Sequence, residues 1–383
     1  MISREVKHGG KLHDLIIREV KRRVRLSERE FAERRKKWSE SEDEVLAYLP
    51  ERAADRDRRY EREENGLPQY TTLKVPYSYG IMMAAHTYFT SVFLARDPVF
   101  QYQGRHGEAQ TSVMAMESII GYQTLVGKQL PPYYSWLYDV GRYGVGILGL
   151  YWDREVHHFS EVEREVEIDP LTQVRTPTGR MVTTTSEVVG YIGNKVYNVR
   201  PQDYLPDPRV TLRDYQKGEF NGVRRKLSWH FLVKRSKNGV YINLEHIDRQ
   251  IKEEFDDSYN DSSMERPKSD VRYHAQYEAS AMEIKRPELV PAYEMYIQVI
   301  PKEWGLSNMD FPEIWVFTVT ADFKTVIGAQ PLGARHGQFP FSVIELESDA
   351  YALSNRGIPE INDPIARTID WLLNSHFYNV RAS

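Results

Sequence analysis

One stretch of the sequence decides the fold: Trp136-Leu-Tyr-Asp-Val-Gly-Arg-Tyr-Gly-Val-Gly-Ile-Leu-Gly-Leu-Tyr-Trp-Asp153. Within it, the periodicity of the apolar residues changes from helical to extended. Trp136, Leu137 and Val140 recur at helical spacing, whereas the residues from Val145 onward form an apolar run of the kind found in buried strands. Gly144 stands at the change, and it predicts a tight turn between a helix and a strand.

The same stretch matches G-x-G-x-x-G over residues 144–149. A dinucleotide-binding fingerprint needs a strand before the glycines and a helix after them, because the pyrophosphate rests on a helix N-terminus. Here the order is reversed, so the glycines indicate a turn rather than a cofactor site. Residues 121–128 fail as a P-loop as well, since five residues separate the glycines and Gln129 stands where Ser or Thr must reach magnesium.

Helices are expected before this stretch and strands after it. Apolar residues recur three or four apart over residues 79–93 and 108–126, and Pro131-Pro132 suits the first turn of the helix that contains Trp136. Strands are expected to continue to about residue 200, with turn signals at 169–170, 177–179 and 193–194.

Farther along the chain, the pattern alternates between helix and sheet. Residues 227–236 and 244–255 predict helices, residues 256–290 a polar loop, and residues 292–346 a small antiparallel sheet with period-two alternation. Residues from Pro359 to Arg381 predict a long amphipathic helix. The chain is therefore expected to have an α+β fold.

The composition narrows the class of protein. The 383 residues have a formal charge of −4 and no cysteine, which excludes disulfides, thiolate metal sites and cysteine nucleophiles and favours a reducing compartment. The aromatic content of 12%, with 25 Tyr and 7 Trp, favours an assembly, because these residues are enriched at protein interfaces. The longest uncharged stretch, 75–95, is too polar for a membrane span.

The first 64 residues contain 34 charged ones, 18 basic and 16 acidic. Such mixed charge is typical of a solvated helix or frayed tail, although Leu12, Ile16, Val20 and Val24 form a weak apolar stripe at helical spacing. We expect a charged helical arm over residues 1–65.

No catalytic constellation is recognisable. His157-His158 with Glu161, Glu163 and Glu165 lacks metal-ligand spacing and fits an exposed strand equally well, and no nucleophile elbow is present.

Three segments together resemble the portal proteins of tailed bacteriophages. They are residues 136–153, the proline-rich segment 199–208 (Val-Arg-Pro-Gln-Asp-Tyr-Leu-Pro-Asp-Pro), and His336-Gly-Gln-Phe-Pro-Phe341 followed by Asn355-Arg-Gly-Ile-Pro-Glu360 and a long helix. The resemblance covers roughly residues 75–383. It implies a portal-like architecture, with a wing over 66–235, a first stem helix and crossing over 236–291, a β-rich clip over 292–347 and a second stem helix over 348–383. The family's crown or barrel is expected to be absent, either because the sequence is a piece of a longer chain or because this member is short.

The resemblance implies a non-enzymatic ring, commonly of twelve subunits, at a capsid vertex of the virion, assembled in the host cytoplasm. Double-stranded DNA would pass through it during packaging and ejection, while terminase and later adaptor or tail proteins dock on the clip and the major capsid protein surrounds it. Neither a cofactor nor a membrane partner is implied.

Two sets of residues are candidates for this role. The candidate channel-facing or inter-subunit residues are Arg356, Arg367, Arg381, Asp363 and Asp370; the arginines fit lateral salt bridges between subunits equally well. The candidate clip docking residues are Lys302, Trp304, Lys324 and Arg335. The alternatives are a soluble intracellular enzyme that uses the 292–346 unit or the histidine pair, and another head-assembly protein.

Overall fold

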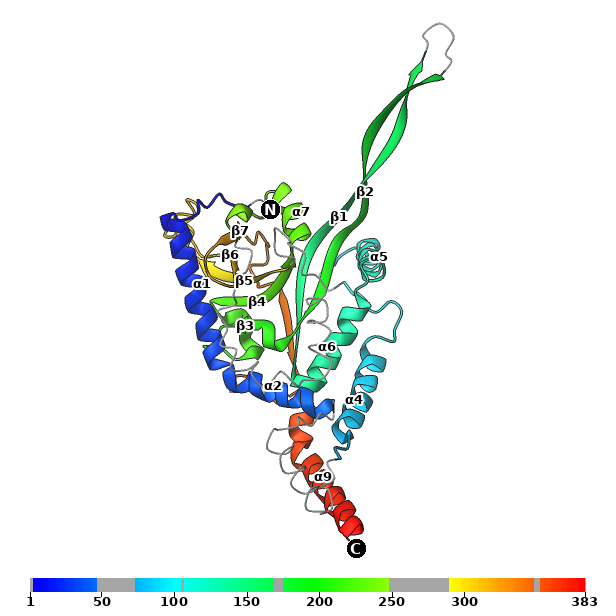
Figure 1. Cartoon of the computed structure of the whole chain (residues 1–383), viewed down its shortest axis with the longest axis vertical. Coiled ribbons are helices and arrows are strands. Elements are labelled where there is room, and N and C mark those ends of the chain that lie inside the picture. Colours follow the sequence, from blue (N-terminus) through cyan, green and yellow to red (C-terminus); the bar gives the residue numbers. More distant parts are fainter. Residues whose placement is uncertain are drawn as a thin grey trace, which may run out of the picture.

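The computed structural model describes residues 3–46, 73–104, 107–168, 175–247, 289–347 and 352–382. The described chain is a mixed α+β structure with two antiparallel sheets, which confirms the expected class. One sheet has five strands in the order β3-β4-β5-β6-β7, and the other has three in the order β2-β1-β8. Figure 1 shows an elongated molecule, with the β1–β2 hairpin projecting at one end and helix α9 at the other.

The α-helices are α1 (Lys11–Glu30), α2 (Ala32–Val45), α4 (Tyr77–Phe93), α5 (Gln110–Val126), α6 (Leu130–Tyr143), α7 (Trp229–Lys237) and α9 (Ile358–Ala382). The strands are β1 (Val145–Ile168), β2 (Arg175–Val199), β3 (Tyr204–Pro206), β4 (Phe220–Ser228), β5 (Leu289–Val299), β6 (Glu313–Thr320), β7 (Val326–Pro331) and β8 (Phe341–Glu345). Short 3-10 helices occupy Pro201–Asp203, Leu212–Lys217 and Leu244–His246.

The predicted turn from helix to strand is confirmed. Helix α6 ends at Tyr143, and Gly144 follows with φ of +80°, the left-handed conformation that glycine adopts at little cost. Strand β1 begins immediately at Val145. The glycine motif therefore has a helix before it and a strand after it.

The strands after Val145 differ from the sequence prediction. They form one long hairpin, in which β1 and β2 pair from Ile147↔Val199 to Ile168↔Arg175. The predicted turns at 177–179 and 193–194 are wrong as strand ends, because both positions lie inside β2. Gly193 and Asn194 pair with Asp153 and Trp152, whereas the register shifts at residues 178–180, between the pairs Arg164↔Met181 and Val166↔Pro177. The predicted turn at 169–170 lies outside the described residues.

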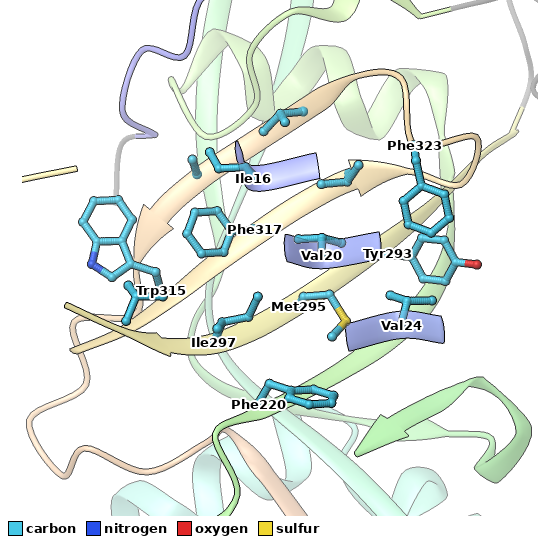
Figure 2. Packing of buried hydrophobic residues seen from close by; sticks show 14 of the residues in the cluster. Ile16, Val20, Val24, Phe220, Tyr293, Met295, Ile297, Trp315, Phe317 and Phe323 are labelled. Carbon is cyan, nitrogen blue, oxygen red and sulfur yellow. The ribbon is translucent and has the colours of Figure 1, made fainter. Parts of the chain in front are cut away.

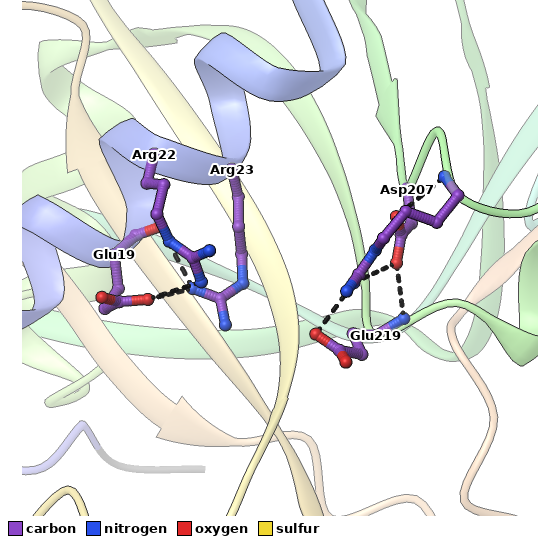
Figure 3. A network of polar contacts seen from close by, with 6 residues as sticks. Glu19, Arg22, Arg23, Asp207 and Glu219 are labelled. Atoms are coloured by element: carbon purple, nitrogen blue, oxygen red, sulfur yellow. Dashed lines mark hydrogen bonds and ion pairs between the residues drawn. The ribbon is translucent and has the colours of Figure 1, made fainter.

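The N-terminal helix is not a solvated arm. Ile16, Val20 and Val24 of α1 are fully buried against the five-stranded sheet, where they contact the apolar face that includes Met295 and Phe317 (Figure 2). Charged residues of α1 such as Asp14 and Arg18 are exposed, whereas Arg23 is buried beside the apolar residues and pairs with Glu19 at 2.7 Å (Figure 3). The expectation of a solvated helix was wrong because three buried aliphatic residues per helix are sufficient to fix it to a sheet.

The predicted antiparallel pairing within residues 292–346 is confirmed, but the sheet is not limited to that unit. Strand β5 pairs with β4 (Phe220–Ser228), and β8 pairs with β1 in the other sheet. The expected boundaries at 235, 292 and 347 therefore do not separate the strands into independent sheets.

The two expected stem helices have different outcomes. Residues 239–247 contain a 3-10 turn at Leu244–His246 instead of the start of an α-helix, and the rest of the predicted 244–255 helix and the 256–288 part of the predicted loop lie outside the described residues. The C-terminal helix is confirmed as α9, which packs against α2, α4 and α6 near its first turns.

Candidate functional site

The predicted channel-facing residues of α9 lie on a helix whose polar side contacts its own chain. Asp370 Oδ1 accepts a hydrogen bond from the Val75 backbone N–H at 2.9 Å. Asn374 binds both the N–H and the C=O of Leu73, at 2.9 and 2.8 Å. Asp370 therefore anchors residues 73–75 to the helix, an intrachain role that the sequence analysis did not predict.

The other residues of this set are spread along the helix. Arg367 Nε donates to Asp363 Oδ1 at 2.8 Å, one helical turn away, and its side chain is 71% exposed. Arg356 is exposed just before α9 begins, and the side chain of Arg381 lies outside the described residues. Because Arg367 already has an acidic partner, an exposed surface of mixed charge results rather than a row of unpaired cations.

The predicted clip docking residues do not form one surface. Trp304 stacks on Phe317 with ring centroids 5.6 Å apart and packs against the core of the five-stranded sheet, so its role is packing. Lys302 is exposed and pairs with Asp310 at 2.6 Å, and Arg335 is exposed in the turn after β7. Lys324 lies in the β6–β7 turn, at the opposite end of the strands from Lys302.

The structure joins the three recognised sequence segments at one junction, which sequence reasoning missed. Its centre is Glu42 of α2, whose carboxylate is buried. Glu42 Oε1 accepts from the Tyr143 hydroxyl at 2.6 Å, from Arg200 Nη2 at 2.7 Å and from Gln202 Nε2 at 2.8 Å. Burial alone would raise the pKa of Glu42, but the charge and hydrogen bonds of Arg200 hold that pKa below its ordinary value.

Helix α2 also holds the segment that leads into α9. Arg34 donates to the Asn355 carbonyl oxygen at 2.6 Å and to both oxygens of Glu360, at 3.2 and 3.1 Å. Trp38 Nε1 donates to the Tyr143 carbonyl oxygen at 3.1 Å. The charged N-terminal region thereby joins α6 to the start of α9.

Two glycines of the recognised segments are required by close backbone approach at this junction. A Cβ at Gly357 would lie 2.3 Å from the Arg142 carbonyl oxygen, and one at Gly144 would lie 2.5 Å from the Arg356 carbonyl group. The two chain segments therefore touch backbone to backbone, and any larger residue would separate them.

The proline-rich segment ends in a buried acid with a structural role. Asp207 accepts hydrogen bonds from the Glu219 backbone N–H at 2.9 Å and from the side chain of Arg209 at 2.8 and 2.6 Å (Figure 3). Burial would raise the pKa of Asp207, but these hydrogen bonds keep it below the ordinary value. The carboxylate fixes the connection between β3 and β4.

A groove of about 970 Å³ lies between the base of β1 and the five-stranded sheet. Its charged groups are paired, since Arg225 Nη1 contacts Glu294 Oε2 at 2.7 Å and Arg235 contacts Asp153 at 3.3 Å. His157 does not line this groove but is exposed on the hairpin. The structure therefore does not bring His157 of the proposed histidine pair into this groove. No group of three or more metal-ligating residues occurs among the described residues.

Large apolar side chains are exposed on three helices. In α4, Tyr88 is 66% and Phe93 60% exposed; in α5, Leu125 is 69% exposed; in α9, Trp371 is 66% and Leu372 54% exposed. On α9, Ile361, Ile365 and Leu372 lie on one side of the helix, away from the side that contacts residues 73–75. Such contiguous exposed apolar surfaces mark interaction sites. Within the described part of the chain, no helix has both the length and the apolarity needed to cross a membrane.

Comparison of the sequence with known proteins identifies no related family or curated protein.

Proposed function

We propose that this chain is a structural subunit of a portal ring at a capsid vertex, which conducts double-stranded DNA and docks terminase, then adaptor or tail proteins. The observation that carries the proposal is the exposed apolar surface of α4, α5 and α9. A ring subunit contacts a neighbour on each of two sides, and its interfaces need such surfaces.

Two further features support a structural rather than a catalytic role. The three segments that resemble portal proteins all bind α2: Tyr143 and Arg200 bind Glu42, and Asn355 binds Arg34. The exposed Arg367 of α9 is paired with Asp363, which limits its use for gripping phosphate. A conduit for moving DNA benefits from such mixed charge, because tight phosphate contacts would resist sliding.

The test is the mass and shape of the purified chain. Light scattering coupled to size-exclusion chromatography is expected to give a particle of ten or more subunits; twelve copies of 44.8 kDa correspond to about 540 kDa. Electron microscopy is expected to show a closed ring with an axial hole wide enough for a duplex. A stable monomer of 44.8 kDa at high protein concentration would refute the proposal.

A matched pair of variants tests the apolar side of α9. Leu372→Glu introduces a charge on this side, and it is expected to reduce the fraction of protein in the ring at least tenfold at micromolar concentration. Gln338→Glu makes the same change in charge at an exposed position after β7 and is expected to leave the fraction unchanged. Equal ring fractions for the two variants would exclude α9 from the interface.

A further inference from the structure

Residues 3–10, which we call the strap, lie along the edge of the five-stranded sheet. The Arg4 backbone N–H donates to the Ala329 carbonyl oxygen at 2.8 Å, and the Ser3 hydroxyl accepts from the Ala329 N–H at 3.3 Å. Ala329 belongs to β7, the last strand in the order of this sheet. The strap therefore binds backbone groups on an edge that another strand would otherwise be free to pair with.

The strap is also held by its apolar side chain, and it ends in two glycines. Val6 is 2% exposed and packs in the core cluster that includes the apolar residues of α1. Its carbonyl oxygen accepts from Asn243 Nδ2 at 2.9 Å. Gly9 has φ of +69° and open space around it, and Gly10 precedes the first residue of α1. The backbone between the strap and α1 is thus of the kind that serves as a hinge.

Three histidines from separate segments meet where the strap joins α1. They are His8 of the strap, His13 of α1 and His246 of the 3-10 helix. The ring of His8 stacks on that of His246 with centroids 4.2 Å apart, and its centroid lies 4.7 Å from that of His13. His8 and His246 are exposed, whereas His13 is 3% exposed. His8 therefore connects the strap to both other segments.

The hydrogen bonds of His13 fit a neutral imidazole. Its Nε2 accepts from the Val326 backbone N–H at 3.4 Å, and its Nδ1 lies 3.4 Å from Asp14 Oδ1. A neutral ring satisfies both contacts when Nδ1 carries the proton, whereas a second proton on Nε2 would face the Val326 N–H. Burial and the charges of His8 and His246 hold the pKa of His13 below its ordinary value, although the hydrogen bond with Asp14 acts in the opposite direction.

The charged residues around the cluster do not favour additional positive charge. Those of the strap, the first turn of α1, the 3-10 helix and the β6–β7 turn are Arg4, Glu5, Lys7, Lys11, Asp14, Glu245, Asp322 and Lys324. Four are basic and four are acidic, so they are balanced while the histidines are neutral. The side chains of Asp14 and Glu245, the acids beside His13 and His246, are 72% and 71% exposed, so solvent weakens their attraction. Asp322 and Lys324 pair with each other at 3.8 Å.

We propose that His8, His13 and His246 form a pH-sensitive latch, which holds the strap on the edge of β7 while their rings are neutral and releases it when they are protonated. Adjacent imidazolium rings at these distances repel one another, and the glycine hinge allows the strap to move away. Because the closed state binds a proton on His13 less tightly, closure is most stable above the ordinary histidine pKa of about 6.5 and weakens as the pH falls below it. The latch does not depend on the proposed ring.

The absence of cysteine permits a direct test in the full-length chain. Val6→Cys places a thiol at the buried residue of the strap, and Lys7→Cys places one at the exposed residue beside it. The rate at which a maleimide dye labels Lys7→Cys, divided by the rate for Val6→Cys, measures closure of the strap, because the division cancels the effect of pH on the reagent. This ratio is expected to be at least fivefold lower at pH 5.5 than at pH 7.5.

Replacement of a cluster histidine is expected to remove this pH dependence. With His13→Gln, whose amide oxygen is able to accept from the Val326 N–H, the ratio should differ less than twofold between pH 5.5 and pH 7.5. His8→Gln removes an exposed ring and should have the same effect. His230→Gln, at an exposed position of α7, is the matched control and should keep the wild-type change.

Either of two results would overturn the inference. One is an equal ratio at pH 5.5 and pH 7.5 in the protein with all its histidines, and the other is a fall that persists unchanged in both cluster variants. A third thiol separates release of the strap from general unfolding: Val319→Cys, fully buried in the same sheet, is expected to remain protected at both pH values. Labelling of Val319→Cys at pH 5.5 as fast as that of Val6→Cys would also overturn the latch.

Discussion

We predict that Asp139 of α6 makes the free energy of unfolding depend on pH between about 4 and 7. Burial raises the pKa of Asp139 to about 7, although the charges of Arg142 and Arg200 act in the opposite direction. An acid whose pKa is higher in the folded than in the unfolded state is preferentially protonated when folded. Stability is therefore highest below the unfolded pKa of about 4, and it falls as the pH rises towards 7.

Asp139→Asn removes this dependence. A pKa about three pH units above the ordinary value corresponds to a maximum of about 4 kcal/mol at 1.36 kcal/mol per pH unit. Because Asp139 is not fully enclosed, we discount this to about 2 kcal/mol at pH 8 and less than 1 kcal/mol at pH 5. The variant is expected to be more stable than the wild type by these amounts.

The measurement is a thermal unfolding series at pH 5, 6, 7 and 8, at one protein concentration for both proteins. For a chain of this length, about 2 kcal/mol corresponds to a rise in Tm of roughly 2–3 °C. The difference should grow from pH 5 to pH 7 and level off by pH 8, because above the folded pKa the carboxyl is ionised in both states. Asp310→Asn, at an exposed ion pair with Lys302, serves as the control and should give a small difference that does not vary with pH. A Tm difference for Asp139→Asn that is the same at pH 5 and pH 8 would refute the reasoning.

Three further predictions concern the fold and the junction. Ile16→Ala removes a fully buried side chain and is expected to lower the free energy of unfolding by about 2–5 kcal/mol in urea titrations, whereas the exposed Arg18→Ala should change it by less than about 0.5 kcal/mol. Gly357→Ala is expected to lower the free energy of unfolding by more than about 2 kcal/mol, because the new Cβ would meet the backbone of Arg142. Gly80→Ala, in α4 with open space around it, should raise the free energy of unfolding by up to about 1 kcal/mol. Similar Tm values for the two variants would contradict the close backbone approach at Gly357. Glu42→Gln is expected to lower the free energy of unfolding by about 2–3 kcal/mol at pH 7. This difference from the wild type should disappear as the pH falls below about 4, because the wild-type carboxylate stabilises the fold only while it is ionised. Equal differences in urea titrations at pH 3 and pH 7 would count against an ionised Glu42.

Local sequence patterns correctly predicted the helices and turns whose apolar periodicity or terminating residue lies within the element itself. The α6–Gly144–β1 transition, helices α4, α5 and α7, and the C-terminal helix α9 all have apolar periodicity or a terminating glycine within their own span. The long hairpin was misread as several strands because Gly193 and Pro177-Thr178-Gly179 are ordinary turn signals, and only cross-strand pairing reveals that they lie inside β2.

The candidate residues were predicted less well than the elements. Trp304 and Asp370 are the types of residue that surfaces and interfaces use, but one packs in the core and the other binds the Val75 backbone. Nothing in the sequence near Glu42 distinguishes it from the other acids of a highly charged region, and its partners Tyr143 and Arg200 lie about 100 and 160 residues away.

By itself, the sequence determined the α+β class, the α6–β1 turn and the α9 helix, because hydrophobic periodicity and backbone conformational preference act over a few residues. Tertiary structure alone decided that α1 belongs to the core, that α2 joins α6 to α9 through Glu42 and Arg34, and that β1 and β2 form one long hairpin. These features depend on which distant segments come into contact and in what register, and the free energy of such contacts arises only when both partners are brought together and removed from water.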